Sequence, residues 1–247
     1  MTFADGSYGA LQGRRDSPSV RRMADVATAL GEELCTRVVF IGASLLPLME
    51  TEEHVLSSAR STGDVDAVVA TTNYSQKFAI EENLRSRGFK NVIGHGAHAD
   101  RWTSPQGTIL DLVACGAHMG GTGNKNDQWV VAHAARTDLP PRVKHASAVG
   151  LLLLKCSAYN DRGAHRPLGS KDLSDIATLI ATRPDVVSEA NAAPIELRGR
   201  IAEQLVTILG APPAVSAIRT HIAEREPLFA GLDDLVLARM RQIADVQ

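Results

Sequence analysis

The pattern of hydrophobic and polar positions divides the chain into two parts, and the change falls near residue 145. Before that point, short runs rich in β-branched residues predict strands, because such side chains pack well on a pleated surface. The strand candidates are Arg37–Ile41, Val65–Ala70 and Thr108–Val113, with weaker ones at 92–93 and 101–103. Amphipathic segments at 18–34 and 75–87 predict helices, the first opening at Ser17-Pro18 and the second ending at Gly88.

Beyond residue 145 the apolar positions recur almost throughout at helical spacing. Helices are predicted at 146–159, 171–181, 196–209 and 214–224, with a last one from Leu232. The fold class is therefore expected to be α/β: a small mixed sheet with flanking helices at 18–145, followed by a helical domain at 146–247. Residues 1–17 are glycine-rich and polar with no sustained period, and they predict a flexible arm.

Composition narrows the range of functions only slightly. The net charge of -2 gives no overall attraction to polyanions, and the aromatic content of 4% argues against a stacking platform for single-stranded nucleic acid. Three separated cysteines with no zinc spacing fit a reducing cytoplasm. The chain begins without a secretory signal, and its apolar runs are too short to span a bilayer, so no membrane partner is expected.

Three aspartates form the pattern that carries chemistry. Asp64 and Asp66 flank Val65 in a strand, so their carboxylates project from one face, with Cα atoms about 6.5 Å apart. Asp111 lies inside the apolar strand ILDLV, where an unpaired carboxylate is costly. If the two strands are neighbours, the acids converge, and a hard divalent cation such as Mg²⁺ or Mn²⁺ would relieve their repulsion.

Each aspartate also has a purely structural interpretation. Asp64 is compatible with a turn after Gly63, Asp66 with a solvent-facing strand position, and Asp111 with a salt-bridged core acid. These alternatives stay open at the level of the sequence.

The segment VVFIGASLL at 38–46 predicts a strand, a tight turn and the start of a helix that continues to about Arg60. Gly42 lets the backbone approach a ligand closely, and Ser44 opens a helix whose free amides attract phosphate oxygens. An ordinary strand-to-helix turn with a serine cap is the alternative interpretation.

These motifs together resemble the nucleotidyltransferase (polymerase-beta-like) superfamily: an apolar strand, Gly-Ala-Ser, a helix, Asp-x-Asp and then a lone Asp in an apolar strand. The resemblance implies that Gly42 and Ser44 bind phosphate and that Asp64, Asp66 and Asp111 bind metal. Ala43 departs from the pattern, because many relatives have glycine or serine there.

The helical part adds a second resemblance. LLLLKCSAYNDRGAHRPLGSKDLSDI at 151–176 is similar to the Lys…Arg…Lys-Asp-x-x-Asp stretch of AbiEii-type nucleotidyltransferase toxins, including the mycobacterial MenT toxins of type IV toxin–antitoxin systems. The resemblance, which covers about residues 35–180, implies that Lys155 and Asp175 complete the active site, with Asp172 as the other candidate acid. Helical spacing independently puts Lys155 on an apolar face, where its charge needs an anion such as a triphosphate or Asp175.

The function expected from these residues is transfer of a nucleoside monophosphate from a nucleoside triphosphate to an acceptor hydroxyl, with release of pyrophosphate. Lys155 would bind the triphosphate, Asp175 would orient it, and Asp111 would assist deprotonation of the acceptor. The toxin resemblance implies a tRNA 3′ end as the acceptor and a cognate antitoxin protein as a partner. The alternatives are a nucleotide-binding regulator without turnover and nucleotidylation of a protein or small molecule.

Overall fold

The structure is a computed structural model that describes residues 17–49, 62–92, 100–116, 125–137, 143–225 and 230–245. The predicted arm lies outside these residues except for Ser17. The end of the helix expected to reach Arg60 also lies outside them.

A seven-stranded mixed sheet runs through the described part of the chain in the order β3-β4-β5-β2-β1-β7-β6. Its two long central strands are β2 (Asp64–Ala70) and β5 (Ile109–Cys115), which pair in parallel. The others are β1 (Val38–Ile41), β3 (Lys90–Asn91), β4 (Arg101–Thr103), β6 (Ala135–Arg136) and β7 (Lys144–His145). β1 runs parallel to β7 and antiparallel to β2, and the remaining pairs are antiparallel. The predicted α/β class is confirmed.

Helices α1 (Pro18–Cys35) and α3 (Tyr74–Ser86) accompany the sheet, with α4 (Lys125–Ala132) before its last strands. The turn after β1 is a short 3₁₀ segment, η3 (Ala43–Leu45), followed by α2 (Leu46–Met49). After His145 every regular element of the described residues is helical. These elements are α5 (Ala148–Ala158), the π turn η5 (Tyr159–Gly163), η6 (Pro167–Gly169), α6 (Lys171–Thr182), α7 (Val186–Ala192), α8 (Ile195–Leu209), α9 (Pro212–Arg225) and α10 (Leu232–Ala244).

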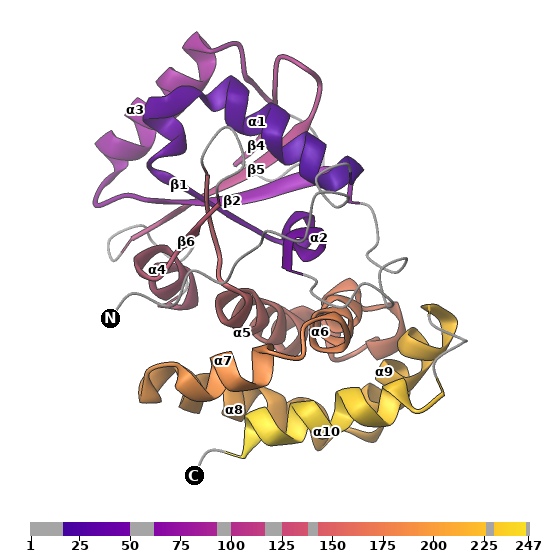
Figure 1. The fold of residues 1–247 in the computed structure, drawn as a ribbon. Coiled ribbons are helices and arrows are strands. Elements are labelled where there is room, and N and C mark those ends of the chain that lie inside the picture. Colours follow the sequence, from indigo (N-terminus) through magenta and orange to yellow (C-terminus); the bar gives the residue numbers. More distant parts are fainter. Residues whose placement is uncertain are drawn as a thin grey trace.

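The elements stack in layers, as Figure 1 shows: α1 and α3 lie on one side of the sheet, and α4, α5 and α6 lie on the other, with α7, α8 and α10 outside them. Alternation along β2 explains this arrangement. Val65, Ala67 and Val69 are fully buried on one face, while Asp64 and Asp66 project from the opposite face. The acidic face of β2 is therefore turned toward the helices that follow residue 145.

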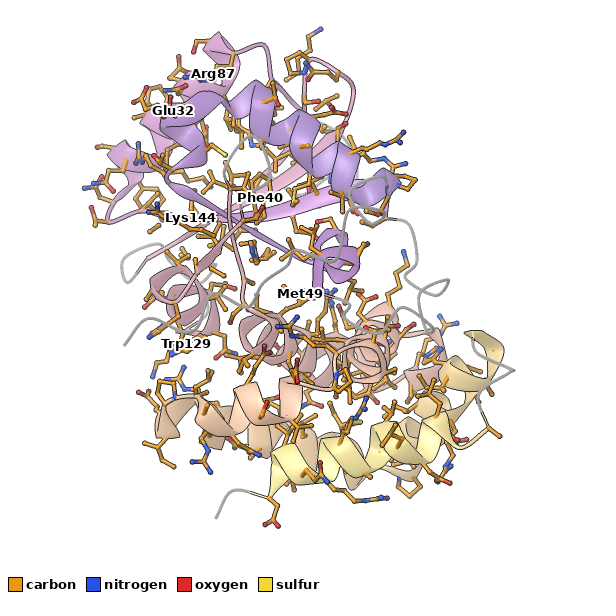
Figure 2. The ribbon with its side chains drawn as sticks, in the orientation of Figure 1. Glu32, Phe40, Met49, Arg87, Trp129 and Lys144 are labelled. Atoms are coloured by element: carbon orange, nitrogen blue, oxygen red, sulfur yellow. The ribbon has the colours of Figure 1, made fainter. Side chains whose placement is uncertain are left out.

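Arg183 joins the end of α2 to the helical layer. Its buried guanidinium donates a hydrogen bond of 3.0 Å to the carbonyl oxygen of Met49 and pairs with Glu189 of α7. Figure 2 shows Met49 at the end of α2 that faces the helices after residue 145. Because the buried guanidinium of Arg183 binds both a carbonyl oxygen of α2 and a half-buried carboxylate of α7, it fixes α2, and the turn before it, relative to α6 and α7.

The sequence analysis missed several short elements. It did not predict α4, α7, β6 or β7, because two-residue strands have no readable period and α4 buries only Val130. The predicted helices at 18–34 and 75–87 and the strong strands are present within one or two residues of their expected ends.

In the described residues, no single helix combines the length and the apolar composition needed to cross a membrane; α8 and α9 meet that test only as a pair, bent by 91°.

We predict that Arg183→Met lowers the free energy of unfolding by about 2–3 kcal/mol, because it leaves Glu189 and the Met49 carbonyl without their buried partner. Urea denaturation followed by circular dichroism measures the change. Arg200→Met is the control, since Arg200 pairs with exposed Glu196 one turn away on α8 and makes only a long hydrogen bond of 3.5 Å to Asn126 of α4. Equal effects of the two substitutions would contradict a joining role for Arg183.

Candidate active site

Asp66 and Asp111 lie directly beside each other on the two central strands. β2 and β5 are parallel, and their register pairs Asp66 with Asp111, while Asp64 pairs with Ile109. Neighbours in register on parallel strands point to the same face, and Asp64 shares that face because it lies two residues before Asp66. The three predicted acids therefore share one face of the sheet, on the side of the helical layer.

Gly42 creates the space that the Asp66 carboxylate occupies. Its φ of 83° lies in the left-handed region, and a Cβ atom at this position would be only 2.0 Å from Asp66 Oδ2. Ile41, the residue before it, pairs with Asp66 across β1 and β2. Gly42 is thus needed both for its backbone conformation and for the close approach of an acid. These two constraints explain the glycine at position 42 directly. The predicted contact of Gly42 with phosphate stays a prediction.

The environment of Asp66 disfavours its charge. Burial raises its pKa to about 6 from an ordinary value of 3.8; Lys155 opposes this increase, and the carboxylates of Asp64 and Asp111 add to it. A cation placed between these acids would remove the conflict.

Asp111 already has a cation. Arg101, its cross-strand partner on β4, donates two hydrogen bonds to the carboxylate, Nε to Oδ1 at 2.7 Å and Nη2 to Oδ2 at 2.6 Å. These bonds raise the pKa of Arg101 further, so its charge is permanent. Asp111 is thus a salt-bridged acid, as one interpretation of the sequence allowed, and its partner is Arg101. Sequence analysis missed Arg101, although it lies at the start of the weak strand predicted at 101–103.

Asp64 is held in place by Thr62, the residue two positions before it in the chain. The hydroxyl of Thr62 donates a hydrogen bond to Asp64 Oδ1, and Arg101 Nη2 lies 3.8 Å from Asp64 Oδ2. Thr62 is itself anchored to α1: its backbone N–H donates to Ser19 Oγ at 3.3 Å, and its carbonyl oxygen accepts from Arg22 at 2.6 Å. The first turn of α1 therefore positions one of the acids.

Lys155 lies across the pocket from the sheet. Its Nζ is 2.7 Å from Asp175 Oδ2 and 3.1 Å from Asp172 Oδ1. Burial alone lowers the pKa of Lys155, but Asp175 and Asp172 outweigh it and keep that pKa above its ordinary value, so the ammonium group stays charged. The predicted pairing of Lys155 with Asp175 is present.

The two candidate acids of α6 occupy different positions. Asp172 lines the pocket and also accepts hydrogen bonds from Arg162, whereas the Asp175 side chain is fully buried and does not line it. Burial raises the pKa of Asp172, but Lys155 and Arg162 more than compensate and hold it below its usual value. Asp172 is thus the acid that faces the pocket, and Asp175 binds Lys155 from the buried interior of the helical layer.

The pocket itself has a volume of about 290 Å³ and lies between the sheet and the helical layer. Of the predicted site residues, Gly42, Asp66 and Lys155 line it, together with Asp172 and Arg162. Asp127 and Asp161 also line it but were not singled out from the sequence, because α4 and the π turn that carry them were not predicted as such.

Ser44 is not among the lining residues. Its side chain is fully buried, and its Oγ donates a long hydrogen bond of 3.5 Å to the carbonyl oxygen of Ile41. Its predicted phosphate contact stays a prediction.

The acids suit Mg²⁺ by their chemistry, although no three acidic, histidine or cysteine side chains of the described residues enclose an ion by themselves. Mg²⁺ is commonly held by one or two carboxylates, with water and substrate phosphates completing its shell. Asp64 and Asp66 can supply those two carboxylates, because both oxygens of Asp111 are bonded to Arg101.

Neither a protein-family model nor a curated protein matches this chain. The chemistry of the pocket must therefore follow from its own residues.

Without metal, Asp66→Asn should raise the free energy of unfolding by about 3 kcal/mol at pH 7.5 and have no such effect at pH 4. The folded pKa of about 6 lies above the unfolded 3.8, so the wild type loses stability as pH rises between these values. Thermal unfolding with a chelator at both pH values measures this. Exposed Glu203→Gln is the control; a pH-independent effect of Asp66→Asn would refute the origin in charge.

Gly42→Ala should destabilise more than Gly107→Ala. Both glycines have nearly the same positive φ, 83° and 84°, but a Cβ at Gly107 meets nothing within 4 Å. A positive φ is costly for alanine at both positions, and Gly42 also has ψ of -175°, so the excess at Gly42 combines that backbone cost with the clash with Asp66. The excess should shrink in an Asp66→Ala background, which removes the carboxylate but keeps the Cβ atom 2.8 Å away, as a double-mutant cycle of denaturation midpoints reveals. An unchanged excess there would show that the Asp66 carboxylate does not cause the clash.

Proposed function

We propose that this chain is a metal-dependent enzyme with a nucleotidyltransferase-type fold, which moves a nucleoside monophosphate from a nucleoside triphosphate to an acceptor hydroxyl. The observation that supports this most is the register of β2 and β5, which sets Asp66 beside Asp111. Both acids lie on the face of the sheet that is turned toward Lys155 across the pocket. Acids on one wall and a buried, permanently charged lysine on the other suit a triphosphate with its cation.

Each group has a separate part in this proposal. Asp64 and Asp66 would hold Mg²⁺. When bound, this ion would neutralise phosphate charge and make the acceptor hydroxyl easier to deprotonate. Lys155 binds the triphosphate and is kept charged and in place by Asp172 and Asp175. Asp111 holds Arg101, so it does not act as the proton acceptor that the sequence suggested.

The finer proposal concerns the acceptor. Arg162 lines the pocket, and His165, Arg166 and Lys171 follow it as exposed residues, with no acidic residue between 162 and 171. This cationic segment supports a phosphate-rich acceptor, and with the toxin resemblance we propose a tRNA 3′ end and inhibition by an antitoxin.

The deciding experiment incubates the protein with each α-labelled nucleoside triphosphate and Mg²⁺ in the presence of total RNA, cell protein or small-molecule extract. We expect label on RNA with release of pyrophosphate, abolished in Asp64→Asn/Asp66→Asn. Label on protein or a small molecule would identify the acceptor as that class instead. If the protein binds nucleotide but releases no pyrophosphate in any mixture, the result would contradict the enzyme and favour a nucleotide-binding regulator without turnover.

Asp172→Asn and Asp175→Asn should differ in their effects on kcat and on stability. Asp172 lines the pocket and also pairs with Lys155 and Arg162, so its loss should lower kcat roughly 10- to 100-fold and destabilise the fold by less than the loss of Asp175. Asp175 is fully buried, so its loss should cost about 2–3 kcal/mol of unfolding free energy as well. Steady-state kinetics and thermal unfolding distinguish them. If Asp175→Asn were as stable as the wild type, Asp175 would not be the buried support of Lys155.

A further inference from the structure

We infer that Arg101 is a built-in cation of the acid cluster, so that the protein binds one divalent ion at Asp64 and Asp66 where three free carboxylates would bind two. This inference rests on the proposed function, since it concerns the same metal-binding acids. It assigns a role to a residue that the sequence motifs leave out, and it changes the expected role of Asp111.

The geometry of the ion pair carries the first step. Both oxygens of Asp111 accept from one guanidinium, at 2.7 and 2.6 Å, in the two-pronged arrangement that arginine makes with carboxylates. A metal ion competing for Asp111 would have to displace two short charged hydrogen bonds. Asp66 instead lines the pocket, and Asp64 accepts a hydrogen bond from the hydroxyl of Thr62.

The backbone keeps Arg101 in this position. It lies opposite Asp111 in the antiparallel pairing of β4 with β5, and its carbonyl oxygen accepts from Val92 N at 2.9 Å and Asn91 Nδ2 at 3.2 Å. The next residue, Trp102, is buried and anchors β4 to the core. Arg101 is therefore an integral part of the sheet beside the acids.

The charges then account for the number of ions. Asp64, Asp66 and Asp111 bring three negative charges, and the guanidinium, 3.8 Å from Asp64, offsets one of them. The remaining two are balanced by a single divalent ion. Lys155 and Arg162 do not change this count, because Asp172 and Asp175 balance their two positive charges. Two-ion sites share carboxylates between metals about 3.5–4 Å apart, and both oxygens of Asp111 are already bonded to Arg101.

The test counts Mn²⁺ bound without nucleotide, using the electron paramagnetic resonance signal of the free ion. The wild type and Arg101→Lys, which keeps the charge, should bind one ion. Arg101→Gln should bind two, because it frees Asp111, and Arg101→Gln/Asp111→Asn should return to one. Circular dichroism of each variant verifies the fold, and Arg101→Met provides a second uncharged variant if glutamine is not tolerated.

The outcomes separate this inference from the proposed function. Two ions in the wild type, or one in folded Arg101→Gln and Arg101→Met, would refute the role of Arg101 and leave nucleotidyl transfer by Asp64 and Asp66 intact. No bound ion in the wild type, or unchanged binding in Asp66→Asn, would refute the metal site and with it both proposals. The expected counts without any pyrophosphate release would support Arg101 while contradicting the proposed enzyme.

Discussion

Burial disfavours the charge of Asp66, the neighbouring carboxylates of Asp64 and Asp111 add to that cost, and much of the structure around the pocket can be understood as a response to it. The register of β2 with β5 leaves Asp66 and Asp111 no way to separate without breaking the sheet. Arg101 compensates Asp111 directly, whereas Asp66 is left in a partly buried position that disfavours its charge. Folded proteins tolerate such a local penalty where it prepares a binding site.

The helical layer supplies the positive side of the same site. Lys155 on α5 is held by two acids of α6, so its charge is maintained despite burial. Asp172 also binds Arg162, which extends the charged network to the π turn at the rim of the pocket. The pocket thus depends on the sheet and the helical layer staying together, and Arg183 contributes to this by bonding the end of α2 to the helices.

The arrangement also has consequences for motion and binding. Groups held by several partners, such as Arg101, Lys155 and Asp64, are oriented before any ligand arrives, which reduces the entropy that binding must overcome. Arg162 is largely exposed, with a side-chain accessibility of 72%, and is the charged wall residue with most freedom to follow a ligand. A triphosphate entering between Asp66 and Lys155 would meet a rigid interior and an adaptable rim.

The sequence by itself determined the α/β class, the main strands and helices, and the residue types of the site. Hydrophobic periodicity, and the glycine and proline residues that end helices and form turns, are local signals that do not depend on tertiary contacts. It also indicated that Asp64 and Asp66 share a face and that Lys155 needs an acidic partner. The assignment to nucleotidyltransferases, and to toxins among them, stays a proposal.

Only the tertiary structure decided which partner each acid has. Arg101 and Asp111 are ten residues apart and meet through strand pairing, which no local pattern specifies. The same is true of Asp172 facing the pocket while Asp175 is buried, because that choice depends on how α6 rotates against α5. Partners that meet through register and helix packing are set by the whole fold, since a shift of one residue would turn each side chain to another face.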